Sequence, residues 1–150
     1  MIRNISFFLV VLAIIALPII RADHDKVIPF DQLPLKVRVM LQKHLDSKIP
    51  MVVTMDWDDY KVKYPSGEKF EFDKDGNWRD LDFWLSQVPA ELVPEQIQAS
   101  VDANFPGTSI VKIERDFDGY DVKLNNGFDL EYNRQFQIID IDDDVDYDLD

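Results

Sequence analysis

The chain contains no cysteine among its 150 residues, which excludes disulfide bonds, thiolate catalysis and cysteine-ligated metals. Basic residues are also few, because 16 lysines and arginines stand against 29 aspartates and glutamates, for a formal net charge of −13. Nucleic acids and anionic membrane surfaces are bound through clustered basic side chains, so the composition argues against both as partners. The excess of acid favours solubility, cation binding or a basic partner.

Histidine is scarce as well, with only two in the chain. His24 lies near the N-terminus and His44 late in a predicted helix, so the sequence has no histidine pair with the i, i+4 spacing of a metal site. It has no glycine-rich phosphate loop and no Gly-x-Ser-x-Gly nucleophile motif either. We therefore predict no catalytic residue. A hydrolase that uses paired carboxylates, such as Asp56 with Asp58, is the third-ranked alternative.

The first 22 residues have the layout of a secretory signal peptide. Arg3 provides the positive region, residues 7–17 are an uninterrupted apolar run, and Ala22 is a small residue suited to cleavage. A membrane anchor is the alternative, but the apolar run is shorter than the roughly 20 residues that span a bilayer. We expect a mature chain that begins near Asp23 and is periplasmic or secreted.

The remaining chain matches itself when it is shifted by 60 residues. Residues 28–82 align with residues 88–142 without a gap, and eleven pairs are identical. The apolar positions coincide too, which favours two copies of one supersecondary unit over chance similarity. The predicted organisation is a signal peptide (1–22), a first repeat with its linker (23–87), a second repeat (88–142) and an acidic tail (143–150).

Each repeat reads as a helix followed by strands. Apolar residues recur at helical spacing, and a proline, Pro34 or Pro94, stands at each helix start. The apolar residues are Leu33, Val37 and Leu41 in the first repeat and Val93, Ile97 and Val101 in the second. Alternating apolar residues and turn-forming residues come next. The predicted fold class is α+β, with two tandem helix-plus-four-stranded antiparallel meander repeats. The helices would pack on one face of one or two sheets.

The hairpin motifs resemble those of a known family. Residues 58–62 (DDYKV) match residues 118–122 (DGYDV), and residues 70–76 (FEFDKDG) have the aromatic-x-aromatic-Asp-x-x-Gly strand and turn usual in the PepSY-like family. These small exported bacterial proteins are similar in fold to the β-lactamase inhibitor protein. The resemblance covers residues 28–142, although residues 130–136 (LEYNRQF) lack the glycine. It implies a periplasmic or secreted, non-catalytic protein that recognises or inhibits a protein or peptide.

A calcium-binding loop is the one metal site that the sequence suggests. Asp73, Asp75 and Asn77 have the alternating spacing with which such a loop begins. An EF-hand, however, needs glycine at its sixth position and glutamate at its twelfth, whereas here Gly76 is fourth and Trp84 is twelfth. A hairpin turn explains the same residues. Calcium is therefore the only cofactor considered, and a calcium-binding or calcium-responsive protein is the alternative function.

Two groups of residues are candidates for contact with a partner. The linker 83–87 has three apolar residues without counterparts in the second repeat, so Phe83 and Trp84 either seal the junction or anchor a partner. Lys61 and Lys63 should point away from the helices, on an outer face that meets either solvent or a partner. The other residues expected on that face are Glu71, Arg79, Lys112, Glu114, Lys123 and Glu131. The expected partner is an unknown protein or peptide in the periplasm.

Overall fold

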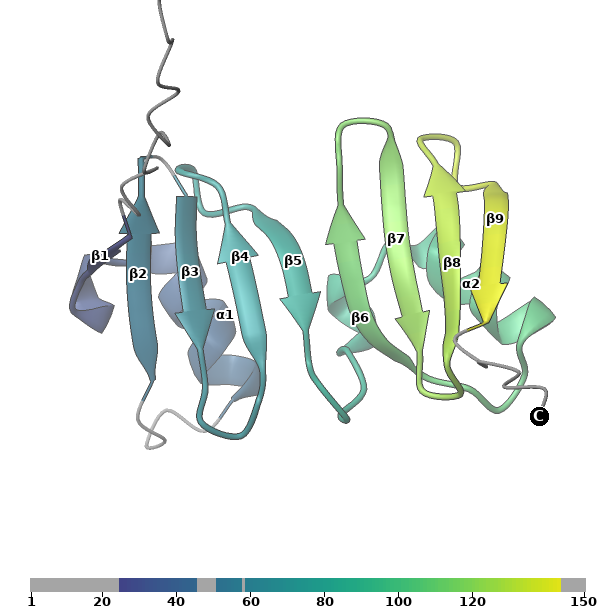
Figure 1. The fold of residues 1–150 in the computed structure, drawn as a ribbon, viewed down its shortest axis with the longest axis horizontal. Coiled ribbons are helices and arrows are strands. Elements are labelled where there is room, and N and C mark those ends of the chain that lie inside the picture. Colours follow the sequence, from purple (N-terminus) through teal and green to yellow (C-terminus); the bar gives the residue numbers. More distant parts are fainter. Residues whose placement is uncertain (1–24, 46–50, 58, 144–150) are drawn as a thin grey trace, which may run out of the picture.

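A computed structural model describes residues 25–45, 51–57 and 59–143, and these form one antiparallel sheet with two α-helices (Figure 1). The predicted signal peptide, His24, Asp58 and the acidic tail after Asp143 lie outside the described residues. In the described part of the chain, no helix is long and apolar enough to cross a membrane.

The elements follow one another in a simple order along the described residues. The strands are β1 (Lys26–Val27), β2 (Val52–Asp56), β3 (Asp59–Lys63), β4 (Lys69–Phe72), β5 (Trp78–Asp82), β6 (Ile110–Arg115), β7 (Gly119–Leu124), β8 (Phe128–Asn133) and β9 (Ile138–Asp143). The helices are α1 (Leu35–His44) and α2 (Glu95–Asn104), each preceded by a short 3₁₀ helix, η1 (Phe30–Gln32) or η2 (Ala90–Leu92). Pro34 and Pro94 stand at the N-caps of α1 and α2, where the backbone N–H that proline lacks has no partner in the helix.

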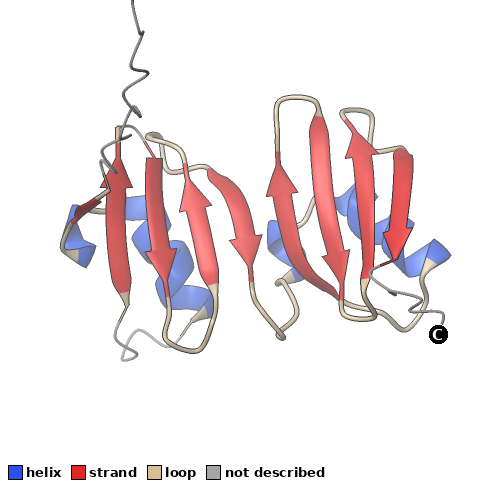
Figure 2. Ribbon diagram, viewed as in Figure 1, coloured by secondary structure: helices blue, strands red, loops and turns tan. Residues whose placement is uncertain are grey.

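One face of the sheet is covered and the other is open. Both α-helices lie behind the sheet in the view of Figures 1 and 2. Six apolar residues face one another across six strands on the covered side, and each is at most 1% exposed: Val62, Phe70, Leu81, Ile113, Val122 and Leu130. Val37 and Leu41 of α1 and Ile97 and Val101 of α2 complete this core. Because side chains alternate along a strand, the residues between them point to the open face.

The predicted architecture of two helix-plus-four-stranded repeats is wrong, although the α+β class fits. The structure has a single sheet of nine strands in the order β1 to β9, and β1 was not predicted. The sheet is continuous because β5 pairs with β6, through Asp80 with Glu114, Leu81 with Ile113 and Asp82 with Lys112. Two separate meanders would each leave an edge of unpaired N–H and C=O groups at this point, and pairing satisfies both edges at once.

Aromatic and cationic contacts close the same junction. The Trp78 ring of β5 lies 6.5 Å from the Tyr120 ring of β7, which stacks on Phe136 at 5.6 Å. The Arg115 guanidinium of β6 lies 4.8 Å from the centre of the Trp78 ring and donates a 2.6 Å hydrogen bond to the Trp78 carbonyl. These contacts tie β5 to β6 and β7 beyond the backbone pairing itself.

We expect the replacement Leu81→Ala to destabilise the whole sheet, and the variant to unfold in a single cooperative transition. Leu81 is fully buried at the pairing of β5 with β6, so its loss leaves a cavity that costs about 2–5 kcal/mol in the free energy of unfolding. Urea unfolding followed by circular dichroism and by tryptophan fluorescence should give one coincident transition, shifted to lower urea. Ile139→Ala, at a side chain 62% exposed, is the control and should change stability little. Two separate transitions would contradict a single cooperative sheet.

Candidate functional site

The open face carries a row of carboxylates that crosses six neighbouring strands. From β4 to β9, the residues that stand opposite one another are Glu71, Asp80, Glu114, Asp121, Glu131 and Asp140, which we call the carboxylate row. Neighbouring strands are roughly 4.8 Å apart, so the row extends over about 24 Å. Like charges directly opposite one another destabilise a sheet, which makes this an unfavourable arrangement unless cations reach it.

The next row on the same face mixes lysines with aspartates. Its members are Lys63, Lys69, Asp82, Lys112, Lys123, Asp129 and Asp142. The Lys112 ammonium lies 3.4 Å from an Asp80 oxygen and 3.2 Å from a Glu114 oxygen. The Lys123 ammonium lies 3.3 Å from Asp129. Both lysines of the second half of the sheet are thus already paired with carboxylates.

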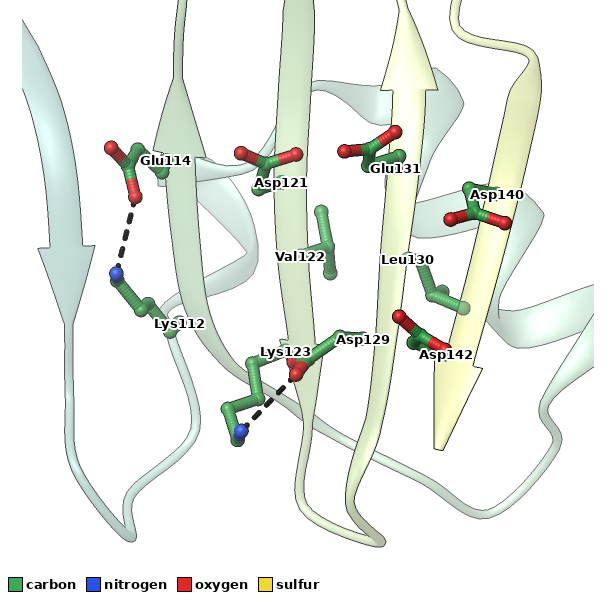
Figure 3. A pocket seen from close by; sticks show the side chains of 10 residues that line it. All are labelled: Lys112, Glu114, Asp121, Val122, Lys123, Asp129, Leu130, Glu131, Asp140 and Asp142. Atoms are coloured by element: carbon green, nitrogen blue, oxygen red, sulfur yellow. Dashed lines mark hydrogen bonds and ion pairs between the residues drawn. The ribbon is translucent and has the colours of Figure 1, made fainter. Parts of the chain in front are cut away.

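The two rows line a hollow of about 430 Å³ over β6 to β9. Figure 3 shows its ten lining residues: Lys112, Glu114, Asp121, Val122, Lys123, Asp129, Leu130, Glu131, Asp140 and Asp142. Six of these side chains are carboxylates and two are ammonium groups. The hollow therefore has a net negative charge, and it is of a size that accommodates a peptide side chain or a small ligand.

Burial and mutual repulsion raise the pKa of two members of the row. Burial is the main cause for Asp80, and the charges of Glu114 and Glu71 add to it against the opposing effect of Lys112, raising the pKa to about 6. One oxygen of Asp80 is buried without a hydrogen-bond partner. The pKa of Asp121 is also raised, first by burial and then by Glu131, Glu114 and other nearby carboxylates. The row is therefore a site where negative charge is concentrated and incompletely neutralised.

The open face is electrostatically uneven from one half to the other. In the first half, Lys61 and Lys63 of β3 and Lys69 of β4 stand on it, and the Lys61 ammonium lies 3.7 Å from Asp25. In the second half, the carboxylates predominate. The structure thus places Lys61 and Lys63 on the predicted outer face, but at the opposite end from the hollow.

The linker residues Phe83 and Trp84 have different surroundings. Phe83 is 4% exposed, and its ring lies 5.1 Å from the Phe70 ring in an edge-on contact, so it belongs to the core and seals the junction. Trp84 is 53% exposed and Leu85 is 84% exposed. Of Phe83 and Trp84, the two linker residues predicted to anchor a partner, only Trp84 is therefore accessible to one in the folded protein.

The predicted calcium loop forms the turn between β4 and β5. One oxygen of Asp73 accepts hydrogen bonds from the N–H groups of Asp75 (2.9 Å) and Asn77 (2.8 Å), and the other accepts from the Asn77 amide (2.9 Å). Partial burial opposes the ionisation of Asp73, but these hydrogen bonds and Lys36 hold its pKa below the usual value. Within residues 25–143, apart from the undescribed gaps, no cluster of three or more metal-ligating side chains forms.

Comparisons with known proteins agree with one another. The model of the family described as "Putative beta-lactamase-inhibitor-like, PepSY-like" matches residues 58–140. Among solved structures, a "putative periplasmic protein" of the DUF2874 family from Bacteroides vulgatus is 38% identical, with a TM-score of 0.75 over 81% of this chain and 99% of that one. A "putative calcium-regulated periplasmic protein" from Bacteroides thetaiotaomicron is 36% identical, with a TM-score of 0.72 over 81% and 98%.

A third solved structure extends the same pattern. It is a "putative periplasmic protein of unknown function" from Bacteroides vulgatus, 29% identical, with a TM-score of 0.70 over 79% of this chain and 99% of that one. No protein of curated function matches this chain. The descriptions of the solved relatives confirm the predicted periplasmic localisation.

Half of the carboxylate row was missed by sequence reasoning. Glu71, Glu114 and Glu131 were expected on the outer face, whereas Asp80, Asp121 and Asp140 were not. Each of the missed residues immediately precedes an apolar residue of a strand, Leu81, Val122 or Ile141, and this alternation is a signal that points them outward. Their alignment into one row depends on strand register, which the sequence does not show.

We expect Asp80→Asn to stabilise the protein at neutral pH, by on the order of 1 kcal/mol because the carboxyl is only partly buried. The folded protein holds the Asp80 proton more tightly than the unfolded chain, since the pKa rises from 3.8 to about 6 on folding. The wild type should therefore lose stability relative to the variant as the pH rises from about 4 to about 6.

Urea unfolding of both proteins at several pH values between about 3.5 and about 7.5 measures this difference. Asp102→Asn is the matched control, because it removes the same charge from the exposed side of α2. A stability difference between Asp80→Asn and wild type that is the same at every pH would contradict the assignment.

Proposed function

This chain belongs to the beta-lactamase-inhibitor-like, PepSY-like family, and we propose that it is a non-catalytic periplasmic binding module that recognises a basic segment of a protein or peptide. The family match and the periplasmic relatives support a binding role outside the cytoplasm. The carboxylate row on the open face is the main observation in favour of a basic partner.

The first argument is the energetic cost of the row. Carboxylates placed opposite one another repel, and this repulsion adds to burial in raising the pKa of Asp80 and Asp121. The single lysine beside Asp80, Lys112, offsets only part of it. Lysine or arginine side chains from a partner would relieve this repulsion on binding. The gain would be larger than for an isolated surface ion pair, because several negative charges act on each incoming cation.

The second argument is accessibility. Both helices cover the opposite side of the sheet, so the row and the hollow beside it are open to solvent across β6 to β9 (Figures 1 and 3). A flat or shallow sheet face suits a macromolecular partner that contacts many side chains at once. The acidic character disfavours nucleic acid and anionic lipid on the same face.

We expect an oligolysine peptide of about eight residues to bind, with an affinity that falls steeply as salt rises. Replacing three members of the row together, as Asp121→Asn, Glu131→Gln and Asp140→Asn, should weaken binding about tenfold or more, since each exposed ion pair contributes up to about 1 kcal/mol. Isothermal titration calorimetry at low and high salt measures both effects.

The matched control removes three carboxylates from the helical side, as Asp31→Asn, Glu95→Gln and Asp102→Asn. These side chains are exposed and lie on η1 and α2. An equal loss of affinity in both triple variants would show that net charge alone governs binding, and it would contradict recognition by the open face.

Calcium binding is the second candidate function. One solved relative is described as calcium-regulated, and Asp73 is held in its ionised form by its turn. A calcium ion at Asp73 would have to replace the hydrogen bonds from Asn77 and gain ligands from the adjacent carbonyls.

Under this candidate, millimolar calcium should raise the melting temperature by several degrees while magnesium does not, because a ligand of the folded state stabilises it by mass action. Asp73→Asn should abolish the response, and Asp121→Asn should preserve it. A response lost in Asp121→Asn but kept in Asp73→Asn would place the ion on the open face and remove the turn from consideration.

A further inference from the structure

A second, mostly apolar pocket adjoins the hollow on the open face. Its volume is about 420 Å³, and its apolar lining comes from Trp84, Leu85, Val111 and Leu124. The remaining lining residues are Asp82, Lys112, Lys123, Asn125 and Gly127. Lys112 and Lys123 also line the acidic hollow, so the two depressions lie next to each other.

Trp84 is held in place at the edge of this pocket by its local structure. Its φ of 61° is a left-handed conformation that is unfavourable for a residue with a side chain. The backbone N–H of Trp84 donates a 2.8 Å hydrogen bond to the Asp82 carboxylate. The indole ring packs so closely over Gly67 that a Cβ added at Gly67 would lie 3.0 Å from the ring. The indole is thus fixed while 53% of the residue stays exposed.

Leu85 adds to the exposed apolar surface beside Trp84. It is 84% exposed, and the Ser86 N–H closes the turn by donating a 3.0 Å hydrogen bond to the Phe83 carbonyl. Tryptophan is enriched at the buried centre of protein interfaces, and Leu85 enlarges the apolar surface beside it. Little ordering of side chains would be needed when a partner binds there.

The charges around the pocket select its occupant. Both lysines at its edge are paired with carboxylates, Lys112 with Asp80 and Glu114, and Lys123 with Asp129. Asp82 supplies a further negative charge. The charged lining of the pocket is Asp82, Lys112 and Lys123, and the surface becomes net negative when the neighbouring Asp80, Glu114 and Asp129 are counted with it. That surrounding surface favours a cationic segment over an anionic ligand. The apolar group that enters should therefore come from a segment that is itself basic.

We infer that the pocket formed by Trp84, Leu85, Val111 and Leu124 takes a large apolar side chain of the partner, adjacent to the basic residues that lie over the carboxylate row. This inference rests on the proposed function and narrows it to segments in which lysine or arginine residues stand next to an aromatic or large aliphatic residue. The row supplies electrostatic attraction, and the pocket supplies contact that salt does not screen.

The test compares two peptides by isothermal titration calorimetry with the full exported chain: hexalysine followed by phenylalanine amide, and hexalysine followed by glycine amide. The phenylalanine peptide should bind roughly tenfold more tightly, and its advantage should persist at high salt. Leu85→Asn and Trp84→Ala should each remove most of that advantage. Phe117→Ala, at an aromatic residue 88% exposed outside the pocket, is the control and should leave it unchanged.

The outcomes separate this inference from the proposed function. Equal binding of the two peptides, with no effect of Leu85→Asn, would contradict the role of the pocket in binding an apolar side chain. It would not contradict the recognition of basic segments. Failure of both peptides to bind would overturn both. Tighter binding of a hexaglutamate–phenylalanine peptide would overturn the assignment of a basic occupant. Leu85→Asn changes only an exposed side chain, so it tests the pocket even where Trp84→Ala fails to fold.

Discussion

The backbone pairing of β5 with β6 is the interaction on which the open face depends. Three residue pairs join these strands. The strands are distant in the chain, because η2 and α2 lie between them. The middle pair, Leu81 with Ile113, lies in the core, and the flanking pairs place Asp80 beside Glu114 and Asp82 beside Lys112 on the other side. A slip of one residue would exchange the two faces, so the burial of the middle pair also sets the register of the carboxylates.

That register has an electrostatic consequence. The row places six carboxylates across six strands. Lys61 stands opposite Glu71 at one end of it, and Lys112 is shared between Asp80 and Glu114. The large apolar core beneath the helices tolerates this repulsion, because burial of its side chains is the dominant favourable contribution to stability. Groups that reduce stability while remaining exposed are typical of surfaces whose role is to meet another molecule.

The two candidate functions depend on separate parts of the molecule. Recognition of a basic segment would use the open face of β5 to β9 and the adjoining pocket at Trp84. Calcium binding would use the turn at Asp73, where the carboxylate is already satisfied by hydrogen bonds. A shift of 60 residues aligns Asp73 with Asn133, whose side-chain oxygen accepts hydrogen bonds from the backbone N–H groups of Gln135 and Gln137 in a similar turn without carrying a charge. Such a neutral counterpart shows that this turn forms without any need for an ion.

The sequence by itself determined the composition, the location and the local elements. The absence of cysteine, the excess of acid, the proline-initiated helices and the alternation in the strands were all readable, because each depends on residues close together in the chain. The family resemblance and the periplasmic location were predicted correctly from the same local motifs. Only the tertiary structure decided that the strands form one sheet, that Phe83 is buried while Trp84 is not, and that the carboxylates align. Each of these depends on pairing between strands distant in the chain, and period-two alternation specifies which side a residue faces but not which residue will stand beside it.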